Sequence, residues 1–338
     1  MDSATALAGS GAPLGRRPAR SRLADPAVRF GLAAIAALLV ALIIFFFAKL
    51  FGEAKPALER EGVFGFLFHN DWDVSRESFG ALPLLAGTLI TSAIALIIGV
   101  PVAVCSAIYA TELCPRALRT ALTVVVELLA AVPSVVYGLW GIFLLAPHLL
   151  GFEKWIASTF SFVPFLGAGA VTVPNYFVAG LVLAIMILPI VSAISRETMA
   201  TVPAEHKEAA LGLGATRWEM IRVAMLPYSR RGIVGGAMLG LGRAVGETIA
   251  VTILIGDSPT LSHHLFSQGY SLAAVIANEF GEATGLHRSA LFASGLVLFV
   301  LTFLIYAVAR IFVMRATRGT HSAILPRSSD IASAESAP

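Results

Sequence analysis

The sequence predicts an all-α membrane protein with six transmembrane helices, on three observations. Hydrophobic residues make up 57% of the 338 residues and charged residues 13%, whereas charged residues are about a quarter of an ordinary soluble domain. The apolar residues gather in six runs, each close to or above the roughly 20 residues that a helix needs to cross a bilayer. The basic residues behind the net charge of +3 flank these runs, which favours a membrane protein over a nucleic-acid-binding protein.

The six predicted spans also define the domain organisation. They cover 30–51, 81–110, 120–147, 175–195, 232–256 and 290–314. The first span is too long for the core of a signal peptide and no small-residue cleavage pattern follows it, so we expect it to remain as a helix. We expect a disordered cytoplasmic tail over 1–29, the first helix with an extracytoplasmic segment over 30–80, a transmembrane domain over 81–314 and a second cytoplasmic tail over 315–338.

The distribution of Lys and Arg predicts which side of the membrane each loop occupies. Cytoplasmic loops carry an excess of these two residues. Both tails and the loops after spans two and four hold 17 of them, whereas the loops on the other side hold 6. We therefore expect both termini and the loop over 203–231 to be cytoplasmic.

Two segments on the opposite side are longer than a connection needs. Residues 52–80 carry an aromatic cluster, which predicts a small element packed on the bundle; its members are Phe64, Phe66, Phe68 and Trp72. Residues 270–283 are apolar but too short to span, which indicates a re-entrant or surface helix. A lid that only covers the bundle edge explains this second pattern equally well.

The loop over 203–231 predicts a helix, a glycine turn and a second helix. It contains the stretch EAALGLGATRWEMIRVAMLP. We expect the first helix to begin after Pro203, with Glu208 near its amino end, where the helix dipole favours a negative charge. Gly212 and Gly214 then permit a sharp turn.

The second helix of this loop is predicted to begin at Thr216, because Glu219 follows three residues later, as in a capping box. We expect this helix to end at Leu226 and Pro227, before the arginines that precede the fifth span. The loop would then present a face of small residues to the cytoplasm, which suits a docking surface for another protein.

The same loop resembles the EAA loop of ABC-transporter permeases, written E-A-A, three residues, G, nine residues, I-x-L-P. The matching residues are Glu208, Ala209, Ala210, Gly214, Leu226 and Pro227, while Ala224 stands where the family usually has Ile. The resemblance implies that the loop docks as a coupling helix into a separate ATP-hydrolysing subunit. That subunit would bind ATP and Mg²⁺, and this chain would bind no cofactor. A plain amphipathic connector would also contain Ala and Gly, but rarely at this spacing.

Two predicted spans contain ionisable residues far from the span ends. Arg243 and Glu247 are four residues apart, hence on one face of a continuous helix, and Glu127 lies in the third span. Charges inside a bilayer are unfavourable unless paired or hydrated, so they usually face the bundle interior and mark a pathway. A guanidinium binds tetrahedral oxyanions through paired hydrogen bonds. We therefore expect Arg243 to bind a transported anion and Glu247 to hold the Arg243 side chain in place. Glu127 can pair with Arg243 across helices or be neutral, and a purely structural Arg243–Glu247 pair is the alternative.

Two stretches of these spans, GRAVGET and ELLAAVPSVVYGLWG, resemble the PstC-type permeases of phosphate ABC importers rather than their PstA-type partners. The resemblance covers about 82–314 and leaves out the N-terminal tail. It implies a type I importer permease with the MetI-like fold, in the bacterial inner membrane, that passes inorganic phosphate. It also implies a PstA-like second permease, a PstB-like ATPase dimer and a PstS-like phosphate-binding protein. Since the chain has no Walker motif, we expect a transport subunit and not an enzyme.

Three other functions fit part of the sequence. A sulfate or molybdate permease would use the same loop and a similar arginine. An ion-coupled secondary transporter could use Glu127, Glu247 and Arg243 as a charge relay, but it would leave the docking loop unexplained. A structural or regulatory membrane subunit would have no need of an intramembrane Arg and Glu.

Overall fold

The computed structural model describes residues 19–167 and 171–318, and most of these are helical. Five helices of the described part are long and apolar enough to cross a membrane, and one bent pair brings the number up to six. They are Val28–Glu61, Leu82–Leu113, Ser134–Thr159, Tyr176–Ala200, Gly285–Ile311 and the pair Arg217–Gly246 with Ile249–Ile255. The all-α membrane fold expected from the apolar runs is therefore confirmed.

The chain divides after Gly52 into two compact units. The first unit is described from Ala19 onward and consists of most of helix α1 (Ala19–Glu61). The predicted disordered tail is wrong for Ala19–Arg29, which are helical, since the Ala, Arg and Leu residues of this stretch favour helix. Residues 1–18 of that tail, and 319–338 of the second one, lie outside the described part of the chain.

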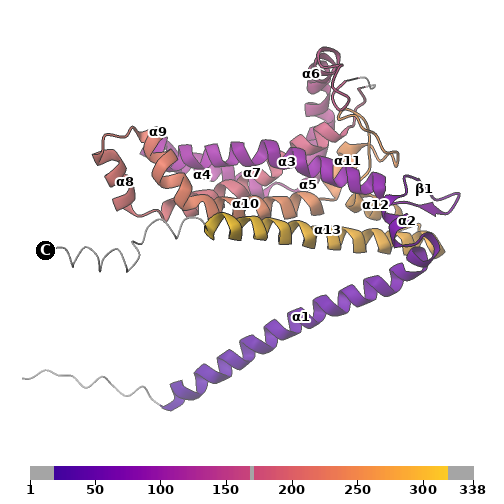
Figure 1. Cartoon of the computed structure of the whole chain (residues 1–338), viewed down its shortest axis with the longest axis horizontal. Helices are drawn as coiled ribbons and strands as arrows, with labels where there is room; N and C mark the ends of the chain where they lie inside the picture. The colour runs from indigo at the N-terminus through magenta and orange to yellow at the C-terminus, as the bar shows by residue number, and fades with distance from the viewer. Residues whose placement is uncertain (1–18, 168–170, 319–338) are drawn as a thin grey trace, which may run out of the picture. The chain divides into compact units, whose positions relative to one another are not determined.

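The second unit is a bundle with α7 at its centre. Its long helices, which run side by side in Figure 1, are α3 (Leu82–Ile108), α7 (Tyr176–Ala200), α10 (Leu226–Gly246) and α13 (Gly285–Arg318). Helix α7 packs against both α3 and α10. Glycines allow this close approach, since a Cβ on Gly180 would meet Ile94 of α3 and one on Gly240 would meet Val191. Small residues at such contacts are typical of membrane helix packing.

The third predicted span, 120–147, is not one helix and does not end where predicted. Helix α4 (Arg116–Ala131) stops before Pro133, and three segments follow: α5 (Ser134–Trp140), the π-helical turn η2 (Gly141–Leu145) and α6 (Ala146–Thr159). Val132 is extended, with ψ 127°, because a residue before proline is disfavoured in the helical region. Beyond that break, the helix runs on to Thr159.

One end of the second unit carries the short elements predicted outside the membrane. These are α2 (Val63–Phe68), the paired strands β1 (Trp72–Asp73) and β2 (Ser78–Phe79), and α12 (Leu272–Glu279). Phe66 and Trp72 are buried while Phe64 and Phe68 are exposed, so only half of the aromatic cluster packs on the bundle. We call this end the α12 end.

Helix α12 lies inside the bundle end rather than on its surface. Leu272 to Val275 are buried, and the helix packs against α3, α11 (Ile249–Ile255) and α13. Its first N–H, from Leu272, donates to the Thr88 hydroxyl of α3 at 3.0 Å. Of the two predicted forms, the surface helix is wrong because the first half of α12 is covered by three neighbouring helices, whereas a re-entrant helix agrees with this buried position.

Candidate functional site

The loop over 203–231 forms the predicted helix, glycine turn and helix at the other end of the bundle (Figure 1). Its segments are α8 (Ala204–Gly212), α9 (Arg217–Met220) and the π-helical turn η3 (Ile221–Met225). Gly214 makes the turn with φ +87°, which only glycine adopts readily. The predicted capping box is confirmed: Thr216 Oγ1 accepts from the Glu219 N–H at 3.3 Å, and Glu219 Oε2 accepts from the Thr216 N–H at 2.8 Å. We call this end the α8 end.

Two details of the loop differ from prediction. Glu208 lies in the middle of α8, and Glu205 occupies the first turn, so the helix-dipole argument applies to Glu205. The second helix does not end at Leu226 and Pro227, because η3 continues directly into α10. Leu226 donates its N–H to the Ile221 carbonyl five residues earlier. In such a wide turn the regular bonding pattern is already interrupted, so the missing N–H of Pro227 is accommodated easily.

The loop is anchored to the bundle on one side and exposed on the other. Ala210 and Leu226 pack against a buried cluster that includes Met199 and Ile221. On the outer side, Glu208, Ala209, Gly214 and Pro227 are exposed. So are large apolar side chains, above all Leu213 at 90% and Trp218 at 58%. Exposed apolar side chains grouped on one element indicate a contact surface for another protein.

Arg243 and Glu247 do not share a continuous helix, so the predicted i, i+4 geometry is wrong. Helix α10 ends at Gly246, Glu247 is extended with ψ 128°, and α11 continues at a bend of 64°. Gly246 is a poor helix former, which favours a break here. Glu247 Oε1 accepts a long bond of 3.4 Å from the Ala250 N–H of α11. No ion pair joins it to Arg243 in the described part of the chain.

Arg243 lies at this break with its side chain exposed. It is in the last turn of α10, where the helix dipole favours a positive charge. Helix α11, which follows this break, packs against α5 of the broken third span. The break therefore brings a cation and, one residue past the helix end, a carboxylate to the same part of the bundle.

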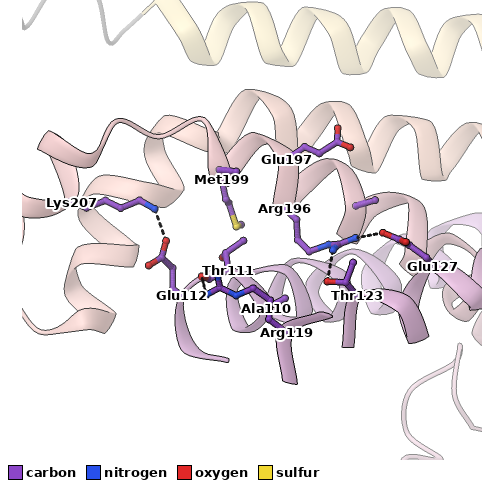
Figure 2. A pocket seen from close by; sticks show the side chains of 12 residues that line it. Ala110, Thr111, Glu112, Arg119, Thr123, Glu127, Arg196, Glu197, Met199 and Lys207 are labelled. Atoms are coloured by element: carbon purple, nitrogen blue, oxygen red, sulfur yellow. Dashed lines mark hydrogen bonds and ion pairs between the residues drawn. The ribbon is translucent and has the colours of Figure 1, made fainter. Parts of the chain in front are cut away.

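Glu127 pairs with a cation, but that cation is Arg196 of α7 and not Arg243. Figure 2 shows Arg196 directed at two residues of α4: its Nη1 donates to Thr123 Oγ1 at 2.8 Å, and its Nη2 lies 3.4 Å from Glu127 Oε1. The side chain of Arg196 is 17% exposed and that of Glu127 61%. Within the described residues, Arg196 Nε is buried and has no hydrogen-bond partner.

These side chains line a cavity of about 470 Å³ at the α8 end (Figure 2). Its lining residues are Ala110, Thr111, Glu112, Arg119, Thr123, Glu127, Ala193, Arg196, Glu197, Met199, Ala200 and Lys207. Lys207 of α8 forms an ion pair with Glu112 of the π-helical turn η1 (Tyr109–Leu113). Arg119 Nη2 donates to the Thr111 carbonyl at 2.6 Å. The cavity thus lies between α8, η1, α4 and α7.

Sequence reasoning missed the part that Arg196, Thr123 and Lys207 have in this cavity. It counted Arg196 and Lys207 only as charges that set the topology. One signal was present: Arg196 follows the apolar run of the fourth span without a helix breaker between them, so it had to lie on the helix itself. Its partner Glu127 is 69 residues away, beyond any spacing rule. Across residues 19–167 and 171–318, no group of three His, Cys, Asp or Glu side chains is arranged to hold a metal ion.

Comparison with known proteins identifies relatives over most of the chain. Residues 99–318 match the family model described as binding-protein-dependent transport system inner membrane component. The chain is 48% identical over 259 residues to the phosphate transport system permease protein PstC of Pasteurella multocida, which covers 75% of this chain and 80% of that protein. The protein of the same name from Mesorhizobium japonicum is 48% identical over 273 residues, 79% of this chain and 83% of that one.

A solved structure shares the fold. The crystal structure of a bacterial alginate ABC transporter in complex with an alginate pentasaccharide-bound periplasmic protein contains a chain that matches with a TM-score of 0.60. The match covers 87% of this chain and 97% of that chain at 18% sequence identity. The likeness therefore concerns the arrangement of the helices.

Proposed function

Because the chain belongs to the family of binding-protein-dependent transport system inner membrane components, we propose that it is the permease subunit through which an ATP-driven importer passes inorganic phosphate. It is a multi-pass inner membrane protein and a transport subunit, not an enzyme. The observation that carries the substrate assignment is the 48% identity to phosphate permeases over 75% of the chain.

A permease of this kind works with an ATPase and a substrate-binding protein. We propose that these are a PstB-like ATPase dimer, which binds ATP and Mg²⁺, and a PstS-like phosphate-binding protein. The loop over 203–231, called the docking loop from here on, supports the first partner, since Leu213 and Trp218 are exposed among the described residues. The excess of Lys and Arg at this end supports a cytoplasmic position for the loop.

A PstA-like second permease is supported by the position of Arg243. An exposed guanidinium in the middle of a span cannot remain against lipid without a large unfavourable free energy. This side chain is exposed here and no ion pair holds it among the described residues. We therefore propose that it faces a pathway between this permease and a second one, where water and phosphate supply the missing contacts.

In the proposed transport cycle, the break between α10 and α11 positions the phosphate contacts. Arg243 donates to the phosphate oxygens, and Glu247 accepts a hydrogen bond from the P–OH group that hydrogen phosphate carries and sulfate lacks. ATP binding at the ATPase dimer moves the docked loops, and the pathway alternates between outward-facing and inward-facing states because ATP binds the two states with different affinity.

Uptake of labelled phosphate tests the substrate and the Arg243 assignment together. Cells that lack this gene are complemented with the wild-type gene or with the Arg243→Gln variant, in the presence of excess sulfate. We expect the wild-type gene to restore uptake that sulfate does not inhibit, and the variant to restore none at equal protein level. Uptake inhibited by sulfate would assign another oxyanion, and normal uptake by the variant would remove Arg243 from the pathway.

Co-purification tests the docking loop. Leu213 is 90% exposed, so Leu213→Asp should leave the fold of this chain intact while it places a charge in the apolar contact. We expect the ATPase to be lost from the purified complex, and the control Leu213→Met to retain it. Full retention of the ATPase by Leu213→Asp would place the contact elsewhere.

A further inference from the structure

We propose that the cavity beside Arg196 is a second oxyanion subsite on the release side of the pathway. While no anion is bound, the Glu127 carboxylate pairs with the Arg196 guanidinium. The proposal rests on the proposed phosphate-permease function and adds to it a site that is distinct from Arg243. Arg196 has more N–H donors than its contacts with the described residues use.

Arg196 is a partly buried cation with unused hydrogen-bonding capacity. A guanidinium has five N–H donors in a planar fork, and among the described residues Arg196 makes one bond to Thr123 and one ion pair with Glu127. Its Nε is buried without a partner in the described part of the chain. An unpaired donor on a buried charge is unfavourable, and a tetrahedral oxyanion with several oxygens can satisfy more donors than one carboxylate oxygen does.

The two contacts of Arg196 differ in strength. The bond to the Thr123 hydroxyl is 2.8 Å and holds the guanidinium against α4. The contact with Glu127 is 3.4 Å long, to a side chain that is 61% exposed. An exposed pair at this distance contributes little and is easily displaced. In the proposed subsite, the Glu127 oxygen therefore occupies the position of a phosphate oxygen and competes with phosphate for the Arg196 guanidinium.

The cavity has room for the anion and for the water that accompanies it. Its volume of about 470 Å³ greatly exceeds the roughly 30 Å³ that one water occupies in the liquid. The other two cations that line it already have partners, because Lys207 pairs with Glu112 and Arg119 donates to the Thr111 carbonyl. Arg196 is thus the cation of the lining set whose partner can be exchanged.

The remaining charges fit release rather than capture. Glu112, Glu127 and Glu197 offset the three cations of the lining set, so the cavity has no strong positive potential to retain a phosphate. Its wall includes Lys207 of the docking loop. An anion that moves from Arg243 toward the α8 end would meet Arg196, exchange with Glu127, and leave when Glu127 returns.

Equilibrium binding of labelled phosphate tests the subsite. The complete importer is reconstituted in nanodiscs without nucleotide or binding protein, and the wild type is compared with Arg196→Gln and Glu127→Gln. We expect Arg196→Gln to weaken binding by about tenfold, because a charge-assisted bond is lost, and Glu127→Gln to tighten it several-fold, because the competitor is removed. The matched control is Arg230→Gln, an exposed arginine outside the cavity, which should bind as the wild type does.

The two substitutions are expected to act in opposite directions, which separates the proposal from damage to the fold. A misfolded permease cannot bind phosphate more tightly, so a gain in Glu127→Gln supports the subsite even where Arg196→Gln assembles poorly. Equal binding in all four proteins, or weaker binding in Glu127→Gln, would overturn the proposal.

Uptake by the same wild-type preparation, with ATP and binding protein added, tests the proposed function separately. If the wild type imports phosphate but all four proteins bind it equally, the subsite alone is refuted. If the wild type imports no phosphate, the proposed function is refuted.

Discussion

The two ends of the bundle differ in how their short elements are attached. At the α12 end, the Leu272 N–H of α12 donates to Thr88 in a buried bond, and the nearby helices α13 and α1 are joined by the Ser289 hydroxyl, which accepts from the Ala57 N–H and donates to the Glu53 carbonyl. At the α8 end, no residue of α8 is buried; besides the packing of Ala210, its attachment is partly exposed, as in the Lys207–Glu112 ion pair. One end is built as a continuation of the core and the other as a separately attached unit.

From this difference we expect the α8 end to be the one that moves in the proposed transport cycle. Elements with few buried contacts open and move at low free-energy cost, and the α8 end combines such an attachment with a cavity and an exposed apolar surface. The α12 end has close backbone packing that resists displacement. The comparison predicts that substitutions at the α12 end reduce stability, whereas those at the α8 end reduce coupling. Four changes test it, given from the largest expected effect to the smallest.

The strongest test places a methyl group where the α12 end has no space. A Cβ on Gly87 would lie 2.0 Å from the Tyr270 carbonyl oxygen, and backbone cannot move aside as a side chain can. We expect Gly87→Ala to destabilise the permease by about 3 kcal/mol, measured as a lower thermal unfolding midpoint. In α8 the matched Gly212→Ala meets open space and should leave the midpoint unchanged or raise it. Equal midpoints for the two variants would contradict the comparison.

A second change removes a buried bridge. The Ser289 hydroxyl joins the Ala57 N–H and the Glu53 carbonyl, two groups that are four residues apart in α1. Ser289→Ala should cost about 2 kcal/mol, because a buried donor and acceptor lose a partner. The exposed hydrogen bond of Thr201 to the Thr198 carbonyl supplies the control, and Thr201→Val should shift unfolding much less. A reversed order would show that burial is not what separates the two ends.

A third change releases α8 from η1. Lys207→Glu opposes Glu112 and removes their ion pair, which is worth about 1 kcal/mol or less in a partly exposed position. We expect the unfolding midpoint to change little while more ATP is hydrolysed per phosphate imported. The double variant Lys207→Glu with Glu112→Lys should restore the ratio. If the double variant stays as uncoupled as the single one, the pair does not carry coupling.

The smallest effect is a pH dependence at the capping box. The Thr216 N–H and hydroxyl donate to the Glu219 carboxylate and hold its pKa below the usual value. Since the folded-state pKa is lowered, the box stabilises α9 at pH values above the unfolded pKa of about 4.3, and this contribution is lost as the pH falls through the folded pKa. Amide protection factors in α9 should therefore drop on acidification in the wild type. In Glu219→Ala they should start lower and stay flat.

Features encoded by neighbouring residues could be predicted from the sequence. The spans follow from the lengths of apolar runs, and the capping box of Thr216 and Glu219 follows from a spacing of three. The pairing of Glu127 could not be predicted, because Arg196 is 69 residues away and is selected by the packing of α4 on α7. The Arg243–Glu247 geometry was wrong because the i, i+4 rule assumes an unbroken helix, and a break at Gly246 changes the direction of everything after it.

The π-helical turn η3 also sets the rotational phase of the docking surface. A π turn places one more residue in a turn than an α-helix does, and each residue of an α-helix rotates the chain by about 100°. The direction in which α8 and α9 face around the axis of α10 therefore depends on a single residue within Ile221–Met225. Deletion of one residue from this turn would keep every side chain of the loop and rotate them all by about 100° around the axis of α10, so here chain length matters as much as residue identity.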